Sequence, residues 1–441
     1  PSTMVWMTGL GYLGGVTSVL LAGIFIAGLG LYTVLVARRW KRLNVTSLAE
    51  LFELRYGRGM RLAASLMILF ALSLFSVGYL KATANVFSAA LGMDEAMIAV
   101  LLCVSVLAVT VMGGLTSVAW TDLFSFCVAV AMIPVLFGTA WFESGGWSAL
   151  RAAYPDSAFA FDPVGTWDSG PVPFRVILTV YFIIVWVYML APWYAQRMFA
   201  ARDESVAYRS MALSTVLVTV LYAMVLLVGS LYHTVNPELG GEAQADRVLG
   251  LAVDAWLPAG LKGLFLATVF AICQTTMSSI WNTHVAMTTE DIYRGLLRRN
   301  ASERERFLFA RVLTVALALF TLLAVFRFDA TVREIHFLGN IFFASLFFAG
   351  IGGFVWSRAG PVSAWTTLLA ANSVGVGLYL WGRYEPPWLP VMEAGWDYHF
   401  YVRALPAILL IGIVIALLEP RRQALEAKKA AFYDRVGAPW R

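Results

Sequence analysis

The sequence predicts an all-α integral membrane protein, and three observations carry this prediction. Of its 441 residues, 60% are hydrophobic and only 13% are charged. In soluble domains about 45–50% of residues are hydrophobic and about 25% are charged. Nearly uncharged runs of about 18 residues or more, long enough to cross a bilayer core, recur along the whole chain. Backbone groups in lipid must be paired within their own segment, so runs of this length are helices. These observations exclude a water-soluble enzyme, a soluble protein with one anchor and a nucleic-acid binder.

Apolar runs and the Gly and Pro residues between them predict one polytopic domain, 1–418, with eleven spans. A helical stub from Pro1 to about Gly9 precedes the spans. The spans are expected at about 11–37, 62–91, 95–112, 119–141, 174–196, 208–231, 258–287, 308–326, 335–356, 361–382 and 399–418. A charged, Ala-rich and helical tail, 419–441, follows. The chain starts with Pro rather than Met and no signal peptide precedes the first span, so we expect an N-terminally truncated sequence.

Basic residues gather in alternate loops, which predicts the orientation of the spans. The basic loops hold Arg38, Arg39, Lys41, Arg42, Arg55, Arg58, Arg61, Arg197, Arg202, Arg209, Arg294, Arg298, Arg299, Arg304, Arg306 and Arg358. The opposite loops carry mostly Asp and Glu, and the tail is again basic. We therefore expect a multi-pass protein of the cytoplasmic membrane with its C-terminus in the cytoplasm. The formal net charge of +5 follows from these loops and requires no acidic partner.

The sequence contains no catalytic or nucleotide-binding motif. Neither an HExxH zinc motif, nor a GxSxG nucleophile motif, nor a phosphate-loop lysine is present. Cys103, Cys127 and Cys273 each lie alone in an apolar run, so we interpret them as small core residues rather than as disulfide or metal-binding cysteines. The chain is therefore expected to be neither an enzyme nor an ATP-driven pump.

The seventh predicted span carries a stripe of hydroxyl and amide side chains. At about 100° per residue, one face of this helix holds Thr275, Ser278, Ser279 and Asn282, and Thr276 borders it. A polar stripe in a membrane helix faces protein rather than lipid. Ser and Thr can bond back to their own helix, or their oxygens can bind a hard cation such as Na⁺ without the full cost of a buried charge. Spacing alone leaves both interpretations open.

Two further features are candidates for a site. Asp122 falls at the predicted start of the fourth span, where an acid can complement the helix dipole or bind a cation. Trp186 and Tyr188 lie near mid-depth in the fifth span, deeper than interfacial aromatics usually lie. Pro192 follows them and interrupts the hydrogen-bond ladder. Aromatic residues beside such a break are suited to line a solute pathway, although close packing explains them equally well.

Four segments together resemble the sodium/solute symporter family, which includes sodium-coupled sugar, proline, pantothenate and sialic acid carriers. Gly113–Asp122 matches the motif Gly-Gly-Leu-x-Ser/Ala-Val-x-Trp-Thr-Asp, and Ala271–Tyr293 matches the Ser/Thr-rich helix that closes with Asp-Ile-Tyr. Ser47–Gly57 resembles the loop after the second core helix, and Gln196–Ala201 the end of the sixth. Each match alone is weak, but together they are specific.

The resemblance implies an inverted repeat of five plus five helices with broken first and sixth helices, followed by two further C-terminal spans. It implies a sodium-coupled symporter that imports a small organic solute by alternating access, with Na⁺ as the coupling ion. The lipid bilayer and the solute are then the expected partners, and no obligatory protein partner is evident.

The resemblance also implies roles for individual residues. Thr275 and Thr276 fall where the family offers hydroxyls to a conserved sodium, with the Ile272 carbonyl on the same side. Three more residues match positions that hold a second sodium in some members: Asp122, Ser278 and Ser279. Ser2 and Thr3 fall where the first core helix touches solute, and the family's remaining sodium ligands, carbonyls of that helix, would lie before Pro1.

The sequence departs from the sugar carriers of the family. Ile184 and Pro192 stand where those carriers have Asn and Gln in the sixth helix, which argues against a sugar and brings the chain closer to the proline-type carriers. Two other functions stay open, namely a membrane sensor module related to transporters and a proton-coupled carrier. A structural membrane protein would need no polar stripe. Sodium-dependent uptake separates these functions.

Overall fold

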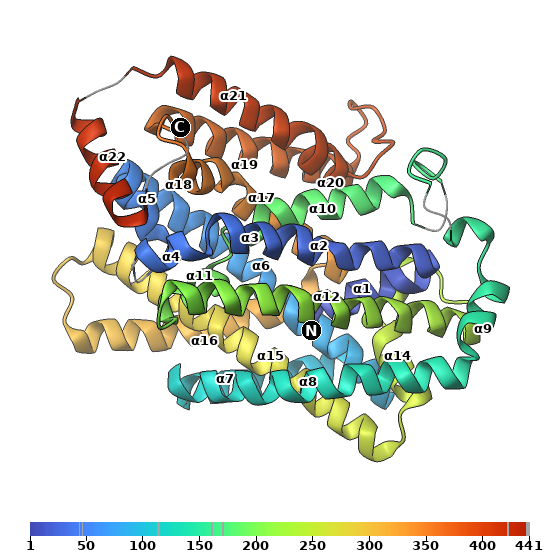
Figure 1. Ribbon diagram of the computed structural model, residues 1–441. Helices are drawn as coiled ribbons and strands as arrows, with labels where there is room; N and C mark the ends of the chain where they lie inside the picture. Colours follow the sequence, from blue (N-terminus) through green and yellow to red (C-terminus); the bar gives the residue numbers. More distant parts are fainter. Residues whose placement is uncertain are drawn as a thin grey trace. The chain divides into compact units, whose positions relative to one another are not determined.

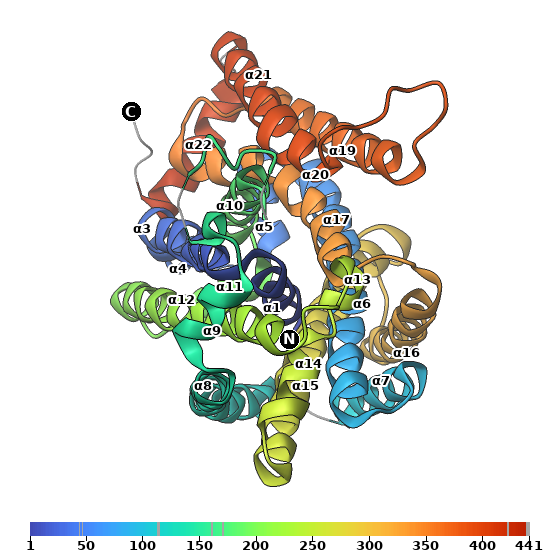
Figure 2. The same cartoon turned by 90° about the vertical axis from the view of Figure 1, so that its right-hand side faces the viewer.

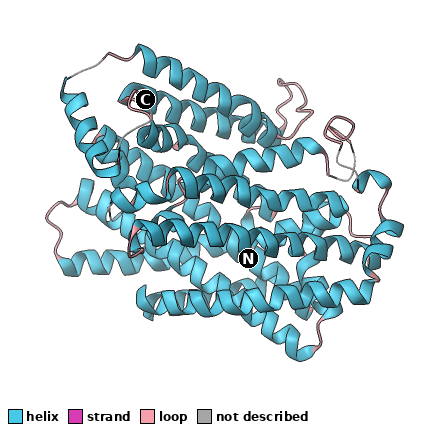
Figure 3. Cartoon of the chain, in the orientation of Figure 1, coloured by secondary structure: helices cyan, strands magenta, loops and turns pink. Residues whose placement is uncertain are grey.

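A computed structural model describes residues 1–43, 45, 47–112, 115–159, 162–169, 172–420 and 423–437. The side chains at 112, 115–122, 242, 243 and 423–425 lie outside this description. Within the described residues all regular secondary structure is helical, with no strand (Figures 1 and 3). This agrees with the predicted all-α class, because helices pair their backbone groups internally along each apolar run.

The chain divides into two compact units, and each unit is described by itself. The first unit comprises Pro1–Gly23, Leu72–Ile177 and Val218–His336, and the second comprises Ile24–Ala71, Leu178–Leu217 and Phe337–Arg441. Some helices continue from one unit into the other: α2 (Gly23–Phe25), α6 (Arg58–Leu91), α10 (Phe174–Tyr188), α12 (Glu204–Val235) and α17 (Val332–Ser345).

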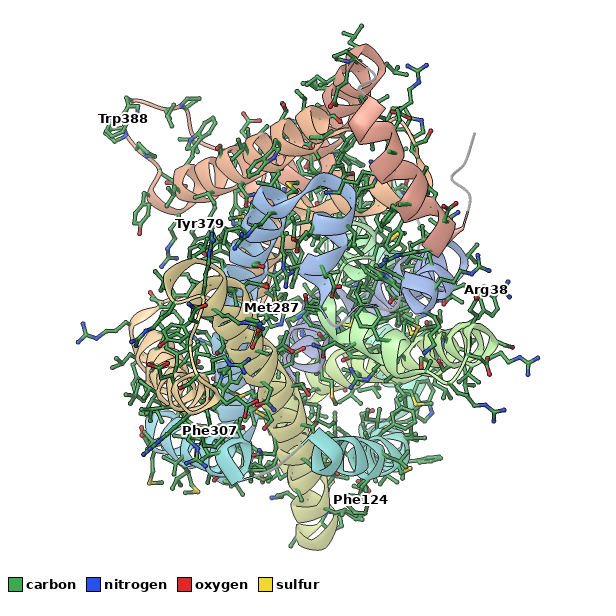
Figure 4. All side chains as sticks on the ribbon, turned by 90° about the vertical axis from the view of Figure 1, so that its left-hand side faces the viewer. Arg38, Phe124, Met287, Phe307, Tyr379 and Trp388 are labelled. Atoms are coloured by element: carbon green, nitrogen blue, oxygen red, sulfur yellow. The ribbon has the colours of Figure 1, made fainter. Side chains whose placement is uncertain are left out.

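In the first unit, α15 packs along α8 and α7, which Figure 2 shows side by side with it. The helices that belong wholly to this unit are α1 (Ser2–Gly14), η1 (Gly15–Ala22), α7 (Glu95–Met112), α8 (Leu115–Ser144), α9 (Gly146–Ala153), η3 (Asp156–Ala158), α13 (Gly241–Ala245), α14 (Val248–Trp256), α15 (Ala259–Met287), η4 (Thr288–Leu297) and α16 (Glu303–Arg327). In Figure 4, Met287 marks the end of α15 and Phe124 lies on α8. Phe124 is 68% exposed, as a lipid-facing residue would be.

Helix α1 packs backbone to backbone against α12. A Cβ atom at Gly11 would overlap the Leu226 carbonyl, and one at Gly229 would overlap the Thr8 carbonyl, so only glycine permits this approach. Helix α1 ends at Gly14, and the residue after it, Gly15, has a φ of +62°, a conformation that favours glycine. The first helix therefore extends to Gly14, beyond the expected limit of the stub.

In the second unit, α19 packs against α21, and α22 packs against α4 and α5. The helices of this unit are η2 (Ile26–Gly30), α3 (Leu31–Leu35), α4 (Ala37–Leu43), α5 (Leu48–Tyr56), α11 (Pro192–Ala200), η5 (Phe348–Gly352), α18 (Gly353–Val355), α19 (Pro361–Tyr384), α20 (Trp396–Tyr398), η6 (His399–Ala404), α21 (Leu405–Leu418) and α22 (Gln423–Val436). Trp388, labelled in Figure 4, lies in the loop after α19 and is 81% exposed.

Among the described residues, eight helices are long and apolar enough to cross a membrane, and a bent pair formed by α10 and α11 makes a ninth. Helix α7 is apolar but shorter over its described residues, and α19 covers another of the predicted spans. The division into eleven spans and a tail stays a prediction. The prediction that all three cysteines are core residues is wrong for Cys127, which is exposed, whereas Cys103 and Cys273 are buried.

Candidate sodium and solute sites

Helix α15 carries the predicted hydroxyl stripe in its second half, inside the first unit. Thr275 and Ser278 are 4% and 2% exposed, while Thr276 and Ser279 are half-buried. The helix is continuous through this region, so the stripe lies on one side of a regular helix, as the period requires. The stripe contacts protein on most of its length, which is what hydroxyls inside a membrane helix require.

The oxygens of Ile272, Thr275 and Thr276 form the first part of the stripe. Thr275 Oγ1 donates a hydrogen bond to the Ile272 carbonyl at 3.3 Å, the back-bonding arrangement common for Thr in membrane helices. The Thr275 oxygen keeps its lone pairs, because it acts here as a donor. The Thr276 hydroxyl forms no hydrogen bond to another described residue. Acceptor capacity is therefore left at the position that resembles a sodium site.

Ser278 belongs to a hydrogen-bonded network that the sequence did not predict. Gln274 Nε2 donates to Ser278 Oγ at 3.1 Å, and Ser278 Oγ lies 2.8 Å from Thr110 Oγ1 on α7. Thr110 donates its one proton to the Val106 carbonyl at 2.7 Å, so Ser278 must donate to Thr110. The Gln274 side-chain oxygen is buried and has no hydrogen-bond partner. Ser278 is thus tied to α7, and an acceptor stays unpaired one turn away.

Gln274 and Thr110 could not have been assigned to this network from spacing alone. Gln274 precedes the hydroxyl run by one residue, and Thr110 lies on a different helix at a position fixed by tertiary packing. The sequence did contain one indication of this network: the Gln274 amide lies inside an apolar span, where it needs partners within the protein.

Asp122 falls among residues whose side chains lie outside the described part of the structure. Its backbone belongs to α8, which begins at Leu115, seven residues earlier. The sequence placed Asp122 at the start of its span, but the helix begins two turns before it. The helix-dipole role therefore loses its support, because that effect falls off within the first turn.

Ser2, at the beginning of α1, is fully buried in the first unit, and Thr3 is half-buried. Ser2 Oγ lies 3.0 Å from Nε2 of His336 on α17. The His336 ring also meets the edges of Phe75 and Tyr79, with centroids 4.8 and 5.4 Å away, and its Nδ1 has no hydrogen-bond partner. Ser2 is among the candidates from the sequence, whereas its partner His336 is not.

The predicted break at Pro192 is present in the structure. Helix α10 ends at Tyr188, α11 begins at Pro192, and the two axes differ by 43°. Pro192 occupies the first turn of α11 after an extended Ala191, where the missing N–H costs nothing. This break agrees with the broken sixth core helix that the family resemblance implies.

The two aromatic candidates beside this break face different neighbours in the second unit. The Trp186 ring is in T-shaped contact with the Phe347 ring, with 4.7 Å between centroids. Its Nε1 donates a hydrogen bond to the Tyr401 carbonyl at 3.3 Å. Tyr188 lies against Phe25 and Tyr194, with centroids 6.1 and 5.4 Å away. Residues two apart on a helix point about 200° apart, so one helix face cannot present both rings.

Among the described residues, no group of three or more His, Cys, Asp or Glu side chains is placed to hold a metal ion. Transition-metal sites need such ligands, whereas Na⁺ is a hard cation that prefers oxygens. The hydroxyl and carbonyl oxygens of α15 thus fit a sodium ion better than they fit a transition metal.

Comparison with known proteins gives the family. The profile of the sodium:solute symporter family matches residues 2–364. The sodium/sialic acid symporter NanT of Aliivibrio fischeri is 26% identical over 297 residues, which cover 65% of this chain and 58% of that protein. The sodium/sialic acid symporter SiaT of Proteus mirabilis is 24% identical over 297 residues, which cover 65% of this chain and 59% of that protein. The chain thus spans somewhat under two thirds of these curated relatives.

A solved structure of a substrate-bound, outward-open Na⁺-coupled sialic acid symporter superposes on this chain with a TM-score of 0.75 at 22% identity. The match covers 96% of this chain and 88% of that one, and it confirms the predicted inverted-repeat fold. A family of symporters also agrees with the absence of catalytic motifs in the sequence. Because its profile extends over most of the sequence, the chain belongs to the sodium:solute symporter family.

Proposed function

We propose that this protein is a sodium-coupled symporter that imports a small organic solute across the cytoplasmic membrane by alternating access. Membership of the family supports the coupling to sodium. The observation that carries the proposal is the hydroxyl stripe of α15, in which Thr276 forms no hydrogen bond to another described residue. Neutral oxygens suit a cation that must leave again, because no bare charge stays behind in the membrane.

The first sodium is assigned to Ile272, Thr275 and Thr276. Thr275 Oγ1 and the Ile272 carbonyl oxygen are 3.3 Å apart, close enough for both to contact one ion, since hard cations take oxygens at about 2.0–2.6 Å. A second sodium is assigned to Asp122, Ser278 and Ser279. The position of Asp122 inside α8, rather than in its first turn, supports a role other than helix capping.

Contact with solute is assigned to Ser2 and Thr3 on α1 in the first unit and, separately, to Trp186 and Tyr188 on α10 in the second unit. The buried pairing of Ser2 with His336 supports a polar contact point on α1. The break between α10 and α11 supports the aromatic part, because interrupted membrane helices free backbone groups for ligands. The relatives named for sialic acid make an organic acid one candidate solute, and Pro192 makes proline another.

The test is uptake into proteoliposomes that contain the full-length protein. Labelled sialic acid, glucose, proline and pantothenate are offered under an inward Na⁺ gradient, and ²²Na⁺ influx is followed in parallel. We expect accumulation of one solute that stops when the Na⁺ gradient collapses. Accumulation driven by a proton gradient without Na⁺ would instead identify a proton-coupled carrier. Binding without accumulation under either gradient would identify a sensor.

The orientation of the protein follows from its basic loops and can be tested separately. We place the C-terminus in the cytoplasm because the Arg-rich loops and the tail lie on one side of the predicted topology. A cysteine-reactive, membrane-impermeant probe should fail to label a cysteine introduced at exposed Arg435 in intact cells, and should label it after permeabilisation. Labelling of intact cells at that position would reverse the topology.

A further inference from the structure

The last described helix, α22, is charged but buries one face in the second unit. Lys429, Phe432 and Val436 are 7%, 2% and 0% exposed, and their spacing of three and four residues places them on one side of the helix. The positions between them include exposed ones, such as Asp434 and Arg435. A charged helix outside the apolar spans that hides one face so completely is docked rather than free in solvent.

The buried face of α22 rests on α4 and α5, which Figure 1 shows beside it. The centroid of the Phe432 ring lies 6.0 Å from that of Phe354 in α18, and the Trp40 ring of α4 is in T-shaped contact with Phe354 at 4.7 Å between centroids. Trp40 is fully buried. Aromatic contacts of this kind contribute more than their buried area alone, so Phe432 is the apolar anchor of the docked helix.

Tyr433 of α22 caps the end of another helix. The helical run that begins with α17 ends at Val355 of α18, and its last carbonyls have no partner within the helix. Tyr433 donates its hydroxyl to the Gly353 carbonyl at 2.9 Å, and Arg39 of α4 donates to the Phe354 carbonyl at 2.6 Å. Tyr56 of α5 donates to the Ala349 carbonyl one turn earlier, at 2.8 Å. Side chains from α4, α5 and α22 thus hold one helix end together.

Arg55 of α5 shows that this docking includes an energetic cost. Its side chain is fully buried and donates to the Ser357 and Ala359 carbonyls at 3.3 and 2.5 Å. Its Nε and Nη1 atoms have no hydrogen-bond partner. The guanidinium lies 5.1 Å from the Tyr56 ring and 5.6 Å from the Tyr433 ring. Undocking α22 would expose the Arg55 charge to water, which is favourable. This gain offsets part of the free energy lost when the aromatic contacts with Arg55 break.

The buried face of α22 is less closely packed at its Lys429 end. A cavity of about 120 Å³ lies between this helix and the segment around residue 358. Its polar lining consists of Ser357, Arg358, Glu419, Glu426 and Lys429, and polar cavities of this size hold water. Phe432 and Tyr433 make the aromatic and hydrogen-bond contacts of α22 with α18, so a small change at these two residues should shift its docking equilibrium.

We propose that α22 is a conformational latch. When docked, it ties together the ends of three membrane-spanning segments: α3 through α4, α6 through α5, and α17 through α18. When undocked, it frees these ends to move apart during the transport cycle, so docking limits the turnover rate. The effect on turnover rests on the proposed function, because a protein that does not alternate between two access states has no such step.

The test compares three variants of the full-length protein. Tyr433→Phe keeps the ring near Arg55 and removes the hydroxyl that donates to the Gly353 carbonyl, and Phe432→Ala removes the apolar anchor. Arg435→Ala, at an exposed position of the same helix, is the matched control. Hydrogen–deuterium exchange is measured in peptides covering 48–56 and 348–357, and turnover is measured as ²²Na⁺ influx in the presence of the solute panel named above.

If α22 is a latch, Tyr433→Phe should raise the hydrogen–deuterium exchange rate in peptide 348–357, and it should raise the turnover rate as well. Each rate should rise by about two- to tenfold, because loss of one hydrogen bond changes an equilibrium constant by that factor. Phe432→Ala should do the same in both peptides, and Arg435→Ala should change neither quantity. Unchanged exchange in the first two variants would show that α22 is not docked as described. Raised exchange with unchanged or lower turnover would show that α22 only caps α18. Either result overturns the proposal.

Failure of the proposed function would look different from failure of the latch. It would appear as an absence of sodium-driven influx in the wild type and in every variant. Failure of the latch would appear in a wild type that transports, as variants with wild-type exchange or without faster influx.

Discussion

The hydroxyl stripe of α15 and the aromatic junction of α10 and α11 differ in the kind of helix that carries them. Helix α15 is continuous from Ala259 to Met287, so the helical period alone sets which side chains share a face. At the junction the period stops at Tyr188 and starts again at Pro192 after a bend of 43°. Side-chain directions there depend on tertiary contacts.

This difference explains why stripe residues share one helix face while Trp186 and Tyr188 have different neighbours. Thr275 and Ser278, three apart on α15, are both buried. Trp186 and Tyr188, two apart beside the break, face Phe347 and Tyr194. An aromatic pair chosen by depth in the membrane is therefore weaker evidence for a shared pathway than a hydroxyl set chosen by helical spacing.

The largest effect is expected from Thr276, a stripe hydroxyl that forms no hydrogen bond to another described residue. Thr276→Ala should raise the Na⁺ concentration for half-maximal uptake by about 10- to 150-fold, because it removes an oxygen that would contact a charged ion. Thr283→Ala is the matched control, since Thr283 also lies on α15 and donates to the Ser279 carbonyl at 2.8 Å. The measurement is solute uptake against Na⁺ concentration, and equal behaviour of the two variants would remove Thr276 from the site.

The second prediction concerns the number of ions. Asp122→Asn and Ser279→Ala should lower the Hill coefficient for Na⁺ from near two to near one, because each removes a ligand of the second sodium. A second ion would add driving force of about 2.3 kcal/mol per 100 mV of membrane potential. Asp203→Asn, at an exposed carboxylate in the second unit, controls for loss of charge. A wild-type coefficient of one would exclude the second sodium.

The junction yields a smaller and more selective prediction. Tyr188→Ala should raise the solute concentration for half-maximal uptake several-fold, by about 3- to 10-fold if one contact of about 1 kcal/mol is lost. Trp186→Ala removes the contact with Phe347 and the bond to the Tyr401 carbonyl, and should lower the thermal midpoint in detergent as well. If both variants fold stably and transport normally, the aromatics only pack and the pathway lies on other helices.

Much of the fold was predictable because lipid allows few alternatives. Long apolar runs must be helices, and a Pro inside such a run favours a break, as at Pro192, although α8 continues through Pro134. The start of α8 at Leu115 was not predictable, because polar residues such as Thr116 and Thr121 give no apolar signal where the helix is already formed. As a result, the sequence predicts Asp122 at the start of its helix, whereas Asp122 lies seven residues after the start of α8.

The candidate site was predictable only in part. The faces of Thr275 and Ser278 follow from helical spacing, but their partners do not. Thr110 reaches Ser278 from α7, and His336 reaches Ser2 from α17, and these pairs are 168 and 334 residues apart in sequence. Contacts of this range depend on packing between helices, which a single sequence does not encode in any local pattern.

The smallest effects are expected in the network around Ser278, where two substitutions separate a paired from an unpaired polar group. Thr110→Val keeps the shape of the side chain but leaves the Ser278 proton without its acceptor. It should lower the free energy of unfolding by about 1 kcal/mol, since hydrogen bonds between membrane helices average about 0.6 kcal/mol and an unpaired buried donor adds to the loss.

Gln274→Met should cost less than Thr110→Val, although Gln274 donates to Ser278 at 3.1 Å. The Gln274 oxygen is buried without a partner, so replacing the amide with an apolar side chain of similar length removes an unpaired acceptor together with one hydrogen bond. The two contributions oppose each other, and the net change in unfolding free energy should stay within about 0.5 kcal/mol. Denaturation in detergent measures both variants. A loss for Gln274→Met larger than that for Thr110→Val would mean that the Gln274 oxygen has a partner in the membrane, and a bound cation would then be the first candidate.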